Sequence, residues 1–106
     1  MNKRLAMLEQ MTATPSADAF AWYGLAMEYR KENRIDDAVA AFTNLRSKFR
    51  DYLAQYLMAG QTLLQSGRAA EAIVWLEQGI DLATLQGNSK ALSELQSALE
   101  EAKELV

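Results

Sequence analysis

The sequence predicts an all-α protein, and three observations lead to this fold class. Apolar residues recur at helical spacing along most of the 106-residue chain. The helix-breaking residues Pro15, Gly67 and Gly87 separate the apolar stretches. The pattern also repeats with a period of 34 residues, a length typical of stacked helix pairs. We therefore expect six helices in a short right-handed α-solenoid.

The expected helices cover residues 2–12, 18–32, 36–49, 52–66, 70–86 and 89–105. Asp18 is a suitable N-cap for the second helix, and Asn88 or Ser89 for the last. Asn33 or Arg34 makes the turn of the first helix pair, as Gly67 does one period later. Residues 1–106 are expected to form a single domain with these parts: an N-terminal helix in 1–13, a first repeat in 19–52, a second repeat in 53–86 and a C-terminal capping helix in 88–106.

The two repeats match each other residue by residue. The first reads Trp22-x2-Leu25-Ala26-x2-Tyr29, followed by Ala38-x3-Phe42, and the second reads Tyr56-x2-Ala59-Gly60-x2-Leu63, followed by Ala72-x3-Leu76. This pattern resembles the tetratricopeptide repeat family, whose consensus is W-x2-L-G-x2-Y, then A-x3-F, then P. Arg50 and Thr84 stand where that consensus has its Pro, so both repeats end less sharply. The resemblance covers residues 19–86 and implies helix pairs that line a concave binding surface, without catalytic residues.

The repeat pattern also predicts a core. Trp22 and Tyr29 share one face of the second helix, and we expect both to be largely buried. Small residues allow the paired helices to approach closely: Ala26, Ala38, Gly60, Ala72 and Gly79.

The two ends of the chain do not follow the repeat. The N-terminal helix carries Leu5, Leu8 and Met11 on one side and resembles the second helix of a preceding repeat. The C-terminal helix has one apolar face, formed by Ala91, Leu92, Leu95, Ala98, Leu99, Ala102 and Leu105. Because a stack of repeats ends in an apolar face, this helix is expected to act as a cap.

Composition excludes several functional classes. The chain has no His and no Cys, which removes the usual general base, the thiolate nucleophile and the commonest metal ligands. We therefore expect no catalytic residue, no metal site and no cofactor. A net charge of −3 argues against nucleic-acid binding. Neither a membrane span nor a signal peptide is recognisable, so a cytoplasmic protein is expected.

The candidate binding site is a second stripe on the first helix of each repeat. Its residues are mostly apolar and would line the concave groove: Phe20, Tyr23, Met27, Leu57, Met58, Gln61 and Leu64. Such a groove suits an apolar peptide or an amphipathic helix of a protein partner. The alternative is that the protein's own terminal helices, or a second copy in a homodimer, fill it. Tyr23 and Leu57 are not expected to belong to the interhelix core.

Trp75 and Leu82 form a second apolar edge, where the first repeat carries Ala41 and Lys48. Something must cover this edge in the second repeat only. Either the C-terminal helix or a contact with a second molecule could do so. The predicted function is thus a protein-interaction module, and the alternative is a self-assembling homodimer that buries the groove or the Trp75 edge.

Overall fold

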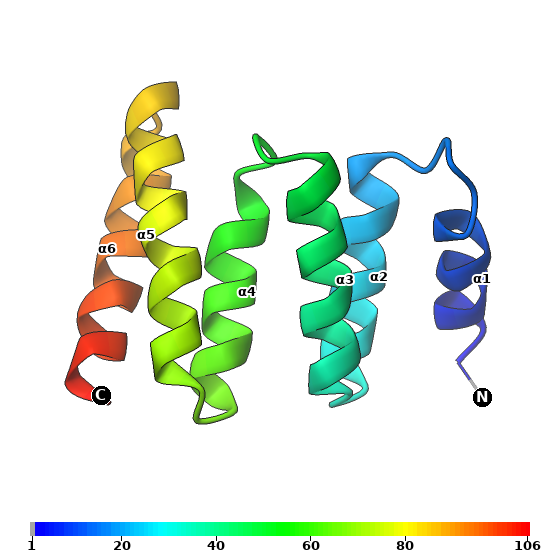
Figure 1. Ribbon diagram of the computed structural model, residues 1–106, viewed down its shortest axis with the longest axis horizontal. Helices are drawn as coiled ribbons and strands as arrows, with labels where there is room; N and C mark the ends of the chain where they lie inside the picture. Colours follow the sequence, from blue (N-terminus) through cyan, green and yellow to red (C-terminus); the bar gives the residue numbers. More distant parts are fainter. Residues whose placement is uncertain (1) are drawn as a thin grey trace. The chain divides into compact units, whose positions relative to one another are not determined.

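The computed structural model describes residues 2–106, and these residues form α-helices and no strand (Figure 1). The helices are α1 (Lys3–Thr12), α2 (Ala19–Lys31), α3 (Ile35–Lys48), α4 (Ala54–Gln65), α5 (Ala69–Gln86) and α6 (Ser89–Glu104). Each begins and ends within two residues of the predicted helix. The predicted all-α fold class is therefore confirmed.

The helices belong to two compact units, each with its own core. Unit 1 ends at Tyr52 and contains α1, α2 and α3, whereas unit 2 (Leu53–Val106) contains α4, α5 and α6. In unit 1, α2 packs against both α1 and α3. In unit 2, α5 packs against α4 and α6, and α6 also contacts α4. The division falls where the second 34-residue period begins.

The same turn ends α2 and α4. Asn33 has a φ of 58° and Gly67, one period later, a φ of 75°, so both are left-handed. In both turns the amide of the next residue donates to the carbonyl five residues earlier, at 2.9 Å after Asn33 and 2.8 Å after Gly67. This arrangement satisfies carbonyls that the end of a helix leaves without partners. The turns predicted at Asn33 and Gly67 are confirmed.

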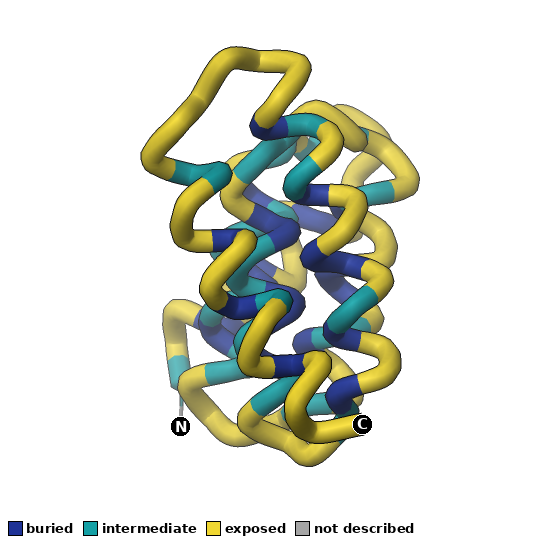
Figure 2. The backbone as a smooth tube through the Cα atoms, turned by 90° about the vertical axis from the view of Figure 1, so that its left-hand side faces the viewer, coloured by how far each residue is buried: buried dark blue, intermediate teal, exposed yellow. Residues whose placement is uncertain are grey.

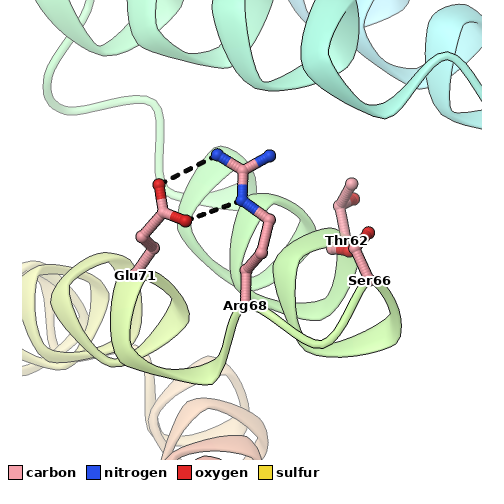
Figure 3. A network of polar contacts seen from close by, with 4 residues as sticks. All are labelled: Thr62, Ser66, Arg68 and Glu71. Carbon is pink, nitrogen blue, oxygen red and sulfur yellow. Dashed lines mark hydrogen bonds and ion pairs between the residues drawn. The ribbon is translucent and has the colours of Figure 1, made fainter.

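An Arg–carboxylate pair follows each of these turns. Nη2 of Arg34 lies 2.9 Å from Oδ2 of Asp37. One period later, Nε and Nη2 of Arg68 lie 2.6 and 2.9 Å from the two carboxylate oxygens of Glu71 (Figure 3). The hydrogen bond from Arg68 holds the pKa of Glu71 below its usual range. Each pair orders the first turn of its helix, which has no side-chain cap.

The core of unit 1 is built from short rows of apolar side chains. Its buried members include Leu5, Leu8, Leu25, Ala26, Phe42 and Leu45. Met11, which the sequence places on the same side as Leu5 and Leu8, is 44 % exposed. Thr12 is buried instead, since it lies one turn after Leu8 and continues the row. Its hydroxyl donates to the Leu8 carbonyl at 2.9 Å, which satisfies the buried polar group.

A buried carboxylate joins α1 to α2. Glu28 is 7 % exposed and accepts a hydrogen bond from Nδ2 of Asn2 at 3.1 Å. Nε of Arg4 lies 3.3 Å from the other oxygen of Glu28. The side-chain oxygen of Asn2 also caps α1, because it accepts from the Leu5 amide at 3.0 Å. A buried charge is tolerated when it is paired in this way.

Close packing in unit 2 depends on two glycines. A Cβ atom added to Gly60 would lie 2.5 Å from Cδ2 of Leu76. One added to Gly79 would lie 2.6 Å from Cβ of Tyr56 and 2.8 Å from Cδ2 of Leu95. Distances this short leave no room for a side chain, so the close approach predicted at Gly60 and Gly79 is confirmed.

Helix α6 covers one side of unit 2. Gly87 ends α5 in the left-handed conformation, with a φ of 68°, and Asn88 caps α6 by accepting from the Ala91 amide at 3.0 Å. Leu95, Ala98 and Ala102 are buried, as expected. Leu105 is 62 % exposed, contrary to the expectation, because α6 ends at Glu104 and the row of packed residues ends with it. The buried positions recur along one side of the helices, and the turns are mostly exposed (Figure 2).

Candidate functional site

The part of the predicted site in unit 1 is an apolar strip along α2. Phe20, Tyr23 and Met27 follow the spacing that places residues on one side of a helix. Phe20 is 71 % exposed, whereas Tyr23 and Met27 are half-buried. A large aromatic side chain that lies mostly in water is the strongest sign of a binding surface on this helix.

Tyr23 is also a structural residue, contrary to the expectation. Its ring packs edge-on against Phe42, with the ring centres 6.5 Å apart. It also packs at a tilt against Tyr52, with the ring centres 5.3 Å apart. Burial raises the pKa of Tyr23, the neighbouring Tyr52 raises it further and Arg30 lowers it. Because Phe42 is fully buried, Tyr23 joins the surface strip to the core of unit 1.

Tyr52 is a neighbour of this strip that the repeat pattern does not predict. Tyr52 lies beyond the end of α3, where its amide donates to the Phe49 carbonyl at 3.2 Å. The ring contact with Tyr23 comes from this tight turn. Residues after the end of a helix do not follow the helical period, so the repeat pattern carried no signal for this contact.

The part of the predicted site in unit 2 is a strip along α4. Its four residues are all half-buried: Leu57, Met58, Gln61 and Leu64. The carbonyl of Met58 accepts a hydrogen bond from the Thr62 hydroxyl at 2.7 Å, so this buried hydroxyl has a partner within its own helix. The strip therefore offers apolar surface and one amide, with none of its residues as exposed as Phe20.

Trp22 and Tyr29 were expected to be largely buried, and the structure places neither of them among the fully buried residues. Both are half-buried, and both line a cleft of about 330 Å³ in unit 1. The complete lining comes from α1, α2, α3 and the residue after α1: Glu9, Thr12, Ala13, Trp22, Leu25, Tyr29, Asp37, Ala40, Ala41 and Asn44. The residues from α3 are small or polar, so none of them covers the two aromatic rings.

Polar and cationic groups surround these rings. The Tyr29 hydroxyl donates to Oε2 of Glu9 at 2.6 Å, and the guanidinium of Arg34 lies 4.7 Å from the Tyr29 ring centre. Burial and the bond to Glu9 raise the pKa of Tyr29 to about 12. Nζ of Lys48 lies 5.8 Å from the Trp22 ring centre. The indole nitrogen of Trp22 is buried and has no hydrogen-bond partner among residues 2–106.

Trp75 is covered within the chain itself. It is 5 % exposed, and its ring centre lies 6.1 Å from that of Tyr56 on α4. Leu82, the other residue of this edge, is half-buried. Trp75 therefore leaves little surface for a contact between two copies, whereas Leu82 stays partly accessible.

None of the helices in residues 2–106 combines the length and the apolar character needed to cross a bilayer.

Comparison with known proteins agrees with the repeat pattern. A family model described as tetratricopeptide repeat matches residues 21–45 and 56–84. No curated protein matches the sequence.

Similar solved structures come from two bacteria. The crystal structure of a tetratricopeptide repeat domain protein from Salinibacter ruber is 36 % identical, has a TM-score of 0.76 and aligns over 84 % of this chain and 100 % of that one. A solution structure of a tetratricopeptide repeat domain protein from the same organism is 36 % identical, with a TM-score of 0.77 over 83 % of this chain and 89 % of that one.

A third structure, a solution structure of a protein from Bordetella parapertussis, has a TM-score of 0.81 over 98 % of this chain and 90 % of that one. At 23 % identity it is similar in fold. The matched segments coincide with the two helix pairs α2–α3 and α4–α5 and together make up half of the sequence. The chain belongs to the tetratricopeptide repeat family.

Proposed function

We propose that the protein is a non-catalytic interaction module that binds an apolar or amphipathic helix of a protein partner. The strip on α2 and the strip on α4 are its proposed binding residues. Tetratricopeptide repeats generally mediate protein–protein interaction, which supports the general class. The proposal adds the chemistry of the partner and the residues that hold it.

The exposure of Phe20 is the observation that carries the proposal. Its side chain is 71 % exposed, and a partner that covered this apolar surface would gain free energy by removing it from water. Tyr23, one turn later, is held in place by its contacts with Phe42 and Tyr52. A fixed aromatic ring beside an exposed one gives a partner helix a pre-ordered apolar anchor.

The strip on α4 is proposed as the equivalent binding surface of unit 2 because of its register. Leu57 and Gln61 are the residues 34 positions after Tyr23 and Met27. Met27 and Met58 have flexible side chains that adapt to irregular apolar surfaces. An amphipathic helix with apolar residues at helical spacing is the ligand that such strips suit best.

Selection from a library of helical peptides tests this proposal. We expect the selected peptides to carry one apolar face, and their binding to be lost in a Phe20→Glu variant. Because the Phe20 side chain lies mostly in water, this variant should keep its helicity by circular dichroism. Val74→Glu is the matched control, since Val74 is 50 % exposed and belongs to neither strip.

Two outcomes would contradict the proposal. Selected peptides that bind Phe20→Glu as tightly as the unmodified protein would show that the strip on α2 is not the site. A concentration-independent dimer in light scattering, dissociated by Phe20→Glu, would favour the homodimer instead.

A further inference from the structure

The cleft in unit 1 occupies the position that a side chain fills in unit 2. Trp22 corresponds to Tyr56 and Ala41 to Trp75, in each case 34 residues later. In unit 2 the Trp75 ring lies 6.1 Å from the Tyr56 ring, and both residues are at least nine-tenths buried. In unit 1 the residue at the second position is an alanine, and Trp22 stays half-buried beside the cleft.

The size and lining of the cleft suit one aromatic side chain. Its volume is about 330 Å³, at the small end of the range of ligand pockets. Trp22 and Tyr29 supply aromatic surface, and Leu25, Ala40 and Ala41 supply aliphatic surface. Aromatic pairs gain stability beyond their buried area when one ring packs on another, as Trp75 does on Tyr56 in unit 2.

Two carboxylates line the cleft, and the cations of Arg34 and Lys48 lie over the Tyr29 and Trp22 rings. Glu9 and Asp37 are its charged lining residues. Asp37 is paired with Arg34, but Glu9 receives its hydrogen bond from the neutral phenol of Tyr29. A cation brought in by an occupant would therefore be attracted to Glu9 at the edge of the cleft.

We propose that this cleft accepts one aromatic side chain of a protein partner, next to a Lys or Arg of that partner. This site goes beyond the proposed function, because it shares no residue with the strips on α2 and α4. The cleft lies between α1, α2 and α3, and its occupant takes the place that Trp75 takes in unit 2.

Nuclear magnetic resonance gives a direct test with an internal control. The chain has two Trp residues, so a nitrogen-15-labelled sample shows two indole N–H signals. A capped, unlabelled Lys-Trp-Lys peptide should shift the signal of Trp22 and leave that of Trp75 unchanged. A Glu-Trp-Glu peptide should bind about two- to fivefold more weakly, as expected for the loss of an exposed charge pair.

Three variants on α3 sharpen the test. Ala41→Phe should fill the cleft from inside, move the Trp22 signal in the free protein and abolish the peptide response. If Ala41→Phe does not fold, Asn44→Phe closes the same cleft from an exposed position. Thr43→Phe is the matched control, because Thr43 is exposed on the same helix and does not line the cleft.

Each contrary outcome would overturn the inference. Equal shifts with a Lys-Ala-Lys peptide would show that charge alone is recognised. Equal affinity for free indole would indicate a small-molecule site. A folded Ala41→Phe variant that still binds Lys-Trp-Lys would place the peptide elsewhere. Phe20 does not line the cleft, so Phe20→Glu should still bind Lys-Trp-Lys even if it loses the helical peptides. The two binding measurements therefore test the cleft and the α2 strip separately.

Discussion

Trp22 in unit 1 and Tyr56 in unit 2 stand at the same position of the 34-residue period, yet their surroundings differ. Tyr56 is 4 % exposed and packs against Trp75, whereas Trp22 lies half-buried beside a cleft. The facing position is Ala41 in unit 1 and Trp75 in unit 2. One turn later the sizes are reversed, with Leu45 in unit 1 and Gly79 in unit 2.

One repeat pattern therefore permits two ways of filling the core. Unit 2 places its large side chain early on α5 and needs Gly79 to make room, since a Cβ there would meet Tyr56 and Leu95. Unit 1 places a fully buried Leu45 one turn later and leaves space beside Trp22. The space proposed to bind a partner in unit 1 thus corresponds to the position that the Trp75 ring fills in unit 2.

The largest expected effect comes from removing the ring of Trp75. Trp75→Ala should lower the free energy of unfolding by about 3–5 kcal/mol, because it empties a well-packed core position. Trp22→Ala should cost roughly half as much, since part of that ring is already in water. Urea unfolding followed by circular dichroism measures both. A larger loss for Trp22→Ala than for Trp75→Ala would contradict the comparison.

A smaller effect is expected from adding one methyl group at Gly79. Gly79→Ala should lower the free energy of unfolding by roughly 1–3 kcal/mol, because the new Cβ would overlap Tyr56 next to the backbone. Gly24→Ala is the control, since its nearest atom is the flexible end of Leu8 at 3.2 Å. The control should change stability little. Equal melting temperatures for the two variants would show that Gly79 is not tightly packed.

The smallest expected effect concerns pH and the polar side of the unit 1 cleft. The pKa of Tyr29 is raised from 10.0 to about 12, so the folded state favours the neutral phenol. The stability that this gives is complete below pH 10 and is lost as pH rises through about 12. Absorbance titration should show a tyrosine that titrates near pH 12, and this step should be absent in Tyr29→Phe.

Glu9→Gln provides the matched variant for that titration. It removes the negative charge beside the phenol and should lower the pKa of Tyr29, while burial keeps it above the ordinary value. In unit 2 the residue that corresponds to Tyr29 is the fully buried Leu63, which has no titrating group. If the pKa of Tyr29 lies at its ordinary value of 10.0, the contact with Glu9 does not persist in solution.

The helices and turns could be predicted from the sequence because their signals are local. Asp18 and Asn88 cap their helices as expected, accepting hydrogen bonds at 2.8 and 3.0 Å. Gly87 marks the end of α5 through a conformation that favours glycine. Such features depend on residues a few positions apart, and helical periodicity shows them directly.

The cleft and the anchoring of Tyr23 could not be predicted, because they depend on volumes facing each other across helices. The repeat pattern placed Trp22 and Tyr29 in the core, but the exposure of Trp22 depends on the small Ala41 of α3. Tyr52 meets Tyr23 through an irregular turn. Comparing Ala41 with Trp75 was possible from the sequence alone, and it pointed to a covered edge in the second repeat and not to a space in the first.

The turns after α2 and α4 have a consequence for modular design. Segments 33–37 and 67–71 share a left-handed first residue, an Arg in second place and a carboxylate in fifth place that pairs with it. The two connectors thus have the same local geometry, although the cores that follow them are filled differently. This separation suggests a design rule in which the connector is kept in each repeat and the facing positions are varied to fill or open the core.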